Sequence, residues 1–170
     1  MAKVWAGCLL CQGPKGDKEL GRTQVWEDDL WRLTTVLGGE IAGFSYLEPK
    51  RHIPHVTDLA GDEARTLGTV LALTMSAIQE ATGAEVVYIY VFGEGIPHLH
   101  IHLAPHRRGD PLNDQMIRGA VVETKLPSGA TSFVSKDFPQ LPVARHEEVR
   151  ERIHRGLAKP HTSQDCHREM

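Results

Sequence analysis

Residues 95–105 read Gly-Ile-Pro-His-Leu-His-Ile-His-Leu-Ala-Pro, and the alternation within this stretch decides the fold prediction. Side chains on a strand point alternately to its two faces, so His98, His100 and His102 should share one face at intervals of about 6.7 Å. The opposite face should be buried by the apolar residues between them, Leu99, Ile101 and Leu103. A row of imidazoles improves neither packing nor solubility. The stretch therefore predicts a strand over 98–104 that carries chemistry.

Further elements are predicted on both sides of this strand. A β-branched and aromatic run over 86–92 should form the preceding strand, and apolar residues at three- and four-residue spacing predict a long helix over 59–82. Strands are expected over 23–26, 30–36 and 41–47, followed near the C-terminus by a hairpin within 120–135 and a surface helix over 143–157. These elements predict an α+β fold: an antiparallel sheet of about five strands with one long helix packed on it.

Composition limits the class of protein. The 170 residues are 41% hydrophobic and 24% charged, as in an ordinary globular domain, and the formal net charge is −3. An acidic balance argues against a broad nucleic-acid binder, and no apolar run reaches the length of a membrane span. Three cysteines do not make a disulfide framework, and the first residues show no signal peptide. We therefore expect a soluble cytoplasmic protein.

Two kinds of chemistry suit the histidine row. Imidazole is a good nucleophile toward phosphorus at neutral pH, and alternating histidines can also offer two nitrogens to a zinc ion. Cys8 and Cys11 are the first two ligands of a second candidate metal site, because two thiolates at this spacing can coordinate one zinc ion. Two further ligands would be needed, and the chain offers His52, His55 and the row at 98–102.

These residues resemble the histidine-triad superfamily, in which three histidines alternate with hydrophobic residues and a proline follows. The resemblance spans 8–105: the Cys pair, a strand-turn-strand around 26–29, a Pro-Lys-Arg-His segment at 49–52, the long helix, and the row itself. Residues 1–142 are then expected to form a histidine-triad-like catalytic domain with a loop and hairpin extension over 106–142. A C-terminal helix over 143–158 and a flexible tail over 159–170 should follow.

The resemblance implies roles for individual residues. His100 would be the nucleophile, held through its other ring nitrogen by a carbonyl of a neighbouring strand, and His102 would assist at the phosphate. Zinc-containing branches of the superfamily imply a structural Zn²⁺ bound by Cys8, Cys11, His52 and His98. Substrate contacts are expected from His98 and from two arginines after the row, Arg107 and Arg108. The resemblance also implies a homodimer joined through the long helix and the sheet.

Two positions depart from the superfamily's pattern. Phe44 stands where members usually carry a histidine, and it cannot donate a hydrogen bond. Val36 stands where an aspartate commonly holds the ribose hydroxyls. We therefore expect substrate recognition to differ from that of the adenosine-preferring members.

The expected function is cleavage or transfer at a nucleoside α-phosphate through a covalent nucleotidyl-histidine. Dinucleoside polyphosphates and nucleoside phosphoramidates are the expected substrates, with a small-molecule nucleotide rather than nucleic acid as partner. Two alternatives are a hydrolase whose catalytic zinc is bound by the histidine row, and a catalytically decayed, zinc-stabilised nucleotide-binding protein.

Overall fold

The computed structural model describes residue 5 and residues 7–92, 95–110, 120–129 and 131–158. The predicted tail over 159–170 and part of the predicted extension, 111–119, lie outside these ranges.

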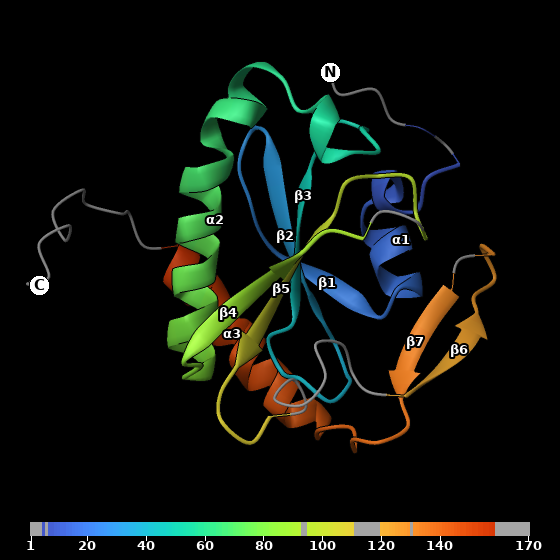
Figure 1. Cartoon of the computed structure of the whole chain (residues 1–170), viewed down its shortest axis with the longest axis vertical. Helices are drawn as coiled ribbons and strands as arrows, with labels where there is room; N and C mark the ends of the chain where they lie inside the picture. Colours follow the sequence, from blue (N-terminus) through green and yellow to red (C-terminus); the bar gives the residue numbers. More distant parts are fainter. Residues whose placement is uncertain (1–4, 6, 93–94, 111–119, 130, 159–170) are drawn as a thin grey trace, which may run out of the picture.

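A five-stranded antiparallel sheet forms the centre of the molecule, as the sequence predicts (Figure 1). Its order is β1-β2-β3-β5-β4, built from β1 (Arg22–Glu27), β2 (Trp31–Val36), β3 (Ser45–Pro49), β4 (Val86–Tyr90) and β5 (Ile101–His106). The turn between β1 and β2 is fixed by Asp28, whose Oδ1 accepts hydrogen bonds from the backbone N–H groups of Leu30 and Trp31 at 2.8 and 2.6 Å. Such an Asx-type turn satisfies backbone donors that the hairpin would otherwise leave open.

One face of the sheet is covered by two helices, α2 (Gly61–Thr82) and α3 (Val143–Leu157) (Figure 1). The core between them includes Trp31 and Leu47 from the sheet and Ile78 from α2, all fully buried. The surface helix predicted over 143–157 is present as α3 with the same bounds. Val149 and Ile153 on its apolar stripe are fully buried, while most of its other residues are exposed, so α3 is a second helix packed on the core.

The opposite face of the sheet carries the short helix α1 (Pro14–Glu19), close to the hairpin of β6 (Val121–Lys125) and β7 (Thr131–Ser135) (Figure 1). The backbone N–H of Ser128 in the hairpin turn donates to Glu19 Oε1 at 2.7 Å. Gly16 allows α1 to approach the preceding turn, because a Cβ there would lie 1.9 Å from the carbonyl oxygen of Leu9. This approach fixes α1 against the segment that carries the Cys pair.

The strand predicted over 98–104 begins later than expected. β5 starts at Ile101, so His98 and His100 lie in the segment before it. That segment is held by other contacts: the N–H of Leu99 donates to the carbonyl of Ile53 at 2.6 Å, and the N–H of His98 donates to that of Ile96 at 2.7 Å. Within the described part of the chain, no helix is both long enough and apolar enough to cross a membrane.

Candidate active site and metal centre

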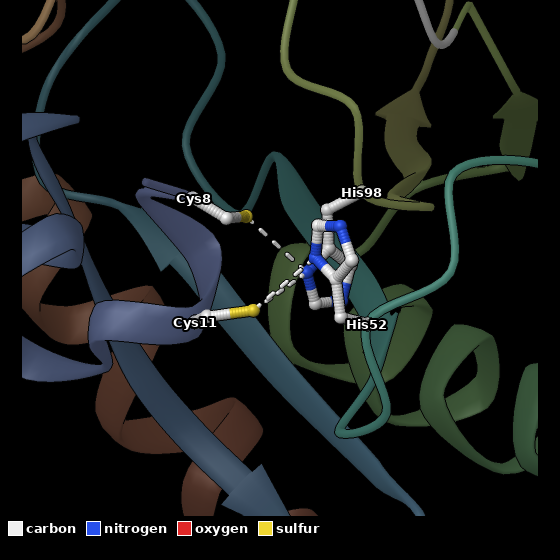
Figure 2. Close-up of side chains that lie close together, drawn as sticks. All are labelled: Cys8, Cys11, His52 and His98. Atoms are coloured by element: carbon white, nitrogen blue, oxygen red, sulfur yellow. Dashed lines mark hydrogen bonds between the residues drawn. The ribbon is translucent and has the colours of Figure 1, made fainter. Parts of the chain in front are cut away.

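Four potential metal ligands from three separate segments meet beside α1 (Figure 2). Cys8 and Cys11 lie in the turn that leads into α1, His52 follows β3, and His98 precedes β5. The Cys11 sulfur lies 3.3 Å from Nδ1 of His52 and 3.4 Å from Nδ1 of His98. The Cys8 sulfur lies 3.5 Å from His98 Nδ1, and the four ligand atoms all lie within 4.8 Å of one another.

This donor set fits zinc. With Zn–S near 2.3 Å and Zn–N near 2.05 Å, tetrahedral geometry separates a sulfur from a nitrogen by about 3.6 Å, close to the distances here. The second nitrogen of His98, Nε2, lies 2.9 Å from the carbonyl oxygen of Pro49, which fixes the ring and leaves Nδ1 as the ligand nitrogen. Burial lowers the pKa of His98, which favours the neutral, coordinating form, and burial raises the pKa of the Cys8 thiol.

His98 was expected to contact the substrate as well as to bind zinc, and its contacts bear on the substrate role. Nδ1 faces the two sulfurs, Nε2 faces Pro49, and the residue is only 2% exposed. Both ring nitrogens are therefore engaged, and the geometry leaves His98 no nitrogen with which to contact substrate.

His100 and His102 remain beside each other on the sheet face opposite α2. Their ring centroids are 5.1 Å apart, and both side chains are half-buried. His100 Nδ1 lies 2.6 Å from the carbonyl oxygen of His98. The carbonyl that holds this ring therefore comes from the same segment, two residues earlier, rather than from a neighbouring strand as expected.

Aromatic side chains surround His102. Its ring centroid lies 5.0 Å from that of Tyr46, 5.4 Å from that of Phe92 and 6.0 Å from that of Phe44. Phe44, which stands where the superfamily pattern usually has a fourth histidine, thus places an aromatic ring near His102. Val36 is 9% exposed and belongs to an apolar cluster with Ile41, Phe44 and Ala104.

A network of four buried charges, which the sequence did not predict, lies between α1 and the sheet. Asp17 pairs with Arg22 at 3.2 Å and Arg32 at 2.6 Å, while Glu48 pairs with the same arginines at 2.6 and 2.7 Å. None of the four residues is more than 7% exposed. Burial alone would lower the pKa of Arg32, but the charge of Glu48 and the bonds to both carboxylates raise it.

The network connects the metal cluster with the histidines. Glu48 precedes Pro49, whose carbonyl holds His98, and the Arg22 guanidinium lies over the Tyr46 ring, 5.1 Å from its centroid. The sequence contains one indication of this network: strand alternation places Arg32 and Glu48 on the sheet face opposite α2. That placement implies burial only because α1 covers this face.

We expect Glu48→Gln to destabilise the fold by about 3–5 kcal/mol, because it leaves a buried arginine charge uncompensated. Urea unfolding followed by circular dichroism measures the loss. Glu27→Gln is the matched control, since the Glu27–Lys50 pair spans 2.9 Å but is 48% and 34% exposed. That pair should contribute only about 0–1 kcal/mol. Equal effects of the two substitutions would contradict the prediction.

The structure does not bring the two arginines after the row to the histidines. Arg107 donates from its guanidinium to the carbonyl of Thr82 at the end of α2, and from its N–H to Asp110 Oδ2 at 2.7 Å. At strand spacing, Arg107 follows His102 by about 16 Å. The N–H of Arg108 points to Glu85 Oε1 at 3.4 Å. These contacts favour a structural role at the far end of β5 over the expected phosphate contacts.

Comparison with known proteins identifies the fold. No protein-family model and no curated protein matches the chain. Among solved structures, a histidine-triad protein from Sinorhizobium meliloti is 21% identical with a TM-score of 0.60, over 81% of this chain and 90% of that one. A hypothetical histidine triad nucleotide-binding protein from Sulfolobus tokodaii matches at 21% identity and a TM-score of 0.57, over 82% and 86%.

A third match links the fold to a metal. A Zn-bound histidine triad family protein from Mycobacterium smegmatis is 19% identical with a TM-score of 0.53, over 79% of this chain and 83% of that one. At these identities the matches establish the architecture rather than the activity. The chain therefore has the fold of the histidine-triad proteins.

Proposed function

We propose that the protein is a nucleotide hydrolase or nucleotidyltransferase that attacks a nucleoside α-phosphate with His100. The observation that carries the proposal is the 2.6 Å contact between His100 Nδ1 and the carbonyl oxygen of His98. A carbonyl only accepts, so Nδ1 must carry the proton and Nε2 must hold the lone pair. A neutral imidazole in this tautomer is a competent nucleophile.

The reaction then has two displacements. Nε2 of His100 attacks the α-phosphorus, and the bond from phosphorus to the leaving oxygen or nitrogen breaks, with that atom taking a proton. Water or another acceptor next attacks the nucleotidyl-histidine, releasing the nucleoside monophosphate and restoring His100. His102, whose ring centroid is 5.1 Å from that of His100, is the group we assign to offset charge on the phosphate.

We assign a structural zinc ion to Cys8, Cys11, His52 and His98, which supply the four ligands of a closed tetrahedral site. Bound there, the ion would pin the turn before α1 to the segment before β5, and it would keep His98 and its carbonyl in place beneath His100. In the described residues, no group of three or more potential ligands includes His100 or His102. This argues against catalytic zinc on the row.

We also propose a homodimer. β4 is an edge strand of the sheet, and edge strands commonly pair with a second chain. Ile89 on β4 and Val91 just beyond its end are 46% and 47% exposed. A second copy would cover them.

The decisive experiment traps the intermediate. The zinc-loaded protein is mixed with adenosine 5′-phosphoramidate, quenched in alkali, and digested for mass spectrometry. An acid-labile, alkali-stable adenylyl group on His100 is expected. Turnover without an adduct on His100 would favour metal hydrolysis, whereas nucleotide binding without turnover would favour the non-enzymatic alternative.

Ribose hydroxyls should contribute little to recognition. Val36 cannot accept a hydrogen bond, so the 2′-deoxy substrate should have a kcat/KM within about tenfold of the ribose form. The measurement compares adenosine and 2′-deoxyadenosine phosphoramidates under identical conditions. A ribose preference above about a hundredfold, or about 2.7 kcal/mol, would show that another residue has taken over the aspartate's role.

A further inference from the structure

An aromatic row runs along β4 and ends at the histidines. Tyr88 and Tyr90 alternate on this strand and Phe92 follows directly, with successive ring centroids 6.4 and 5.8 Å apart. The Tyr90 and Phe92 rings are stacked, with 21° between their planes. At one end the rings of Phe92 and His102 meet edge to face with their centroids 5.4 Å apart, and at the other Tyr88 stacks on His106 with the centroids 5.2 Å apart. The row therefore leads to the ring that neighbours His100.

Much of this aromatic surface faces outward. Phe92 is 51% exposed and Tyr88 is 39% exposed, while Tyr90 between them is half-buried. The three residues alternate with Ile89 and Val91, so the rings share the sheet face of His102 whereas the aliphatic pair belongs to the other face. The main hydrophobic core lies on that other face and includes none of the three rings. Tyr90 packs against the smaller apolar cluster around Phe44 and Ala104, whereas Tyr88 and Phe92 are the exposed rings.

On the opposite side of His102 the same face is closed. α1 and its four-charge network cover the β1–β2–β3 side, where Arg22 lies over Tyr46. Next to them Val36, Ile41 and Phe44 form an apolar cluster, and each is less than 10% exposed. Among the described residues, the exposed surface next to His102 is therefore the aromatic row on the β4 side. A planar group attached to a phosphate at His100 would contact this surface.

We propose that Tyr88, Tyr90 and Phe92 form a stacking platform for the nucleobase of the bound nucleotide. The inference rests on the proposed function only for the position of the phosphate at His100. Stacking on an aromatic ring strengthens base binding by about five- to 150-fold and tolerates every base, since each has a π-face. Phe92 offers no hydrogen-bond donor or acceptor, so the platform should discriminate weakly among bases.

The test measures binding rather than turnover. Adenosine monophosphate and ribose 5-phosphate are titrated by calorimetry into the zinc-loaded protein, and the ratio of their Kd values reports the base contribution. The wild type should bind adenosine monophosphate at least about fivefold more tightly. Phe92→Leu should remove that preference, whereas Phe92→Trp, which keeps a ring, should retain it. Val122→Ala, which shortens an exposed valine on β6 outside the proposed dimer interface, is the control and should change nothing.

Several outcomes would overturn the platform. Equal affinity for the two ligands in the wild type would do so, as would failure of adenosine monophosphate to bind or an unchanged preference in Phe92→Leu. So would a change only in oligomeric state on size exclusion, because Phe92 would then be an interface residue. Loss of the proposed chemistry gives a different result: no adduct forms on His100 while the preference for adenosine monophosphate persists.

Discussion

Replacing His100 with alanine should lower kcat by about 10⁴-fold or more, because the covalent path loses its only nucleophile. The fold should be little affected, since His100 is half-buried and lies before β5 rather than within it. Single-turnover kinetics with adenosine 5′-phosphoramidate give the rate, and circular dichroism gives the melting temperature. Nucleotide binding should persist, because the substitution removes no part of the aromatic row on β4.

His55→Ala provides the control for His100→Ala. His55 is an exposed histidine that lies outside the metal cluster, so its loss should leave kcat unchanged. The kcat of His102→Ala should lie between those of His100→Ala and His55→Ala, since we assign His102 to charge stabilisation rather than to bond formation. If His100→Ala keeps kcat within about tenfold of the wild type, another group is the nucleophile and the tautomer argument built on His98 fails.

The sheet and the helices were largely predictable because their hydrophobic periods are clear. The apolar spacing over 59–82 predicts α2, and the acidic turn before Trp31 predicts the first hairpin. Four residues far apart in sequence were also correctly brought together at the Cys–His cluster. That grouping came from the resemblance to histidine-triad proteins, since the Cys pair alone left its partners among several histidines undecided.

Other features depend on tertiary contacts that sequence periodicity does not encode. Alternation predicted a strand from His98, but the backbone of Leu99 bonds to Ile53 and the regular pairing begins at Ile101. This local turn puts the His98 carbonyl against His100, which a straight strand would not do. The period of α3 showed an apolar stripe but could not show that the stripe is fully buried.

The charge network could not have been found from pattern alone. Arg32 and Glu48 read as ordinary polar residues alternating with core residues, which is how a solvent-facing strand surface looks. That surface is buried only because α1 packs over it. α1 can pack there because Gly16 has no side chain to clash with the carbonyl of Leu9. The same docking fills the sheet face on the β3 side of His102, so the proposed nucleobase site lies on the β4 side.

Removal of the metal should destabilise the whole site, since we assign Cys8, Cys11, His52 and His98 to one zinc ion. Structural zinc contributes up to about 10–16 kcal/mol in peptides that fold only with metal. Here a separate core persists, so we expect a smaller loss, on the order of 5 kcal/mol, and a fall in Tm of about 10–20 °C. Elemental analysis of protein purified without chelator should find one zinc per chain, and calorimetric scans after chelation measure the shift in Tm.

The pattern of variants separates this role from general damage to the fold. Cys11→Ser and His52→Ala should each lose zinc and approach the Tm of the chelated protein, while His55→Ala should keep both the zinc and the Tm. Because the ion would hold His98, whose carbonyl orients His100, kcat should fall along with zinc content, and re-addition of zinc should restore it in the wild type alone. Protein that contains no metal, or whose Tm is unmoved by chelation, would show that the four residues are a hydrogen-bonded cluster rather than a zinc site.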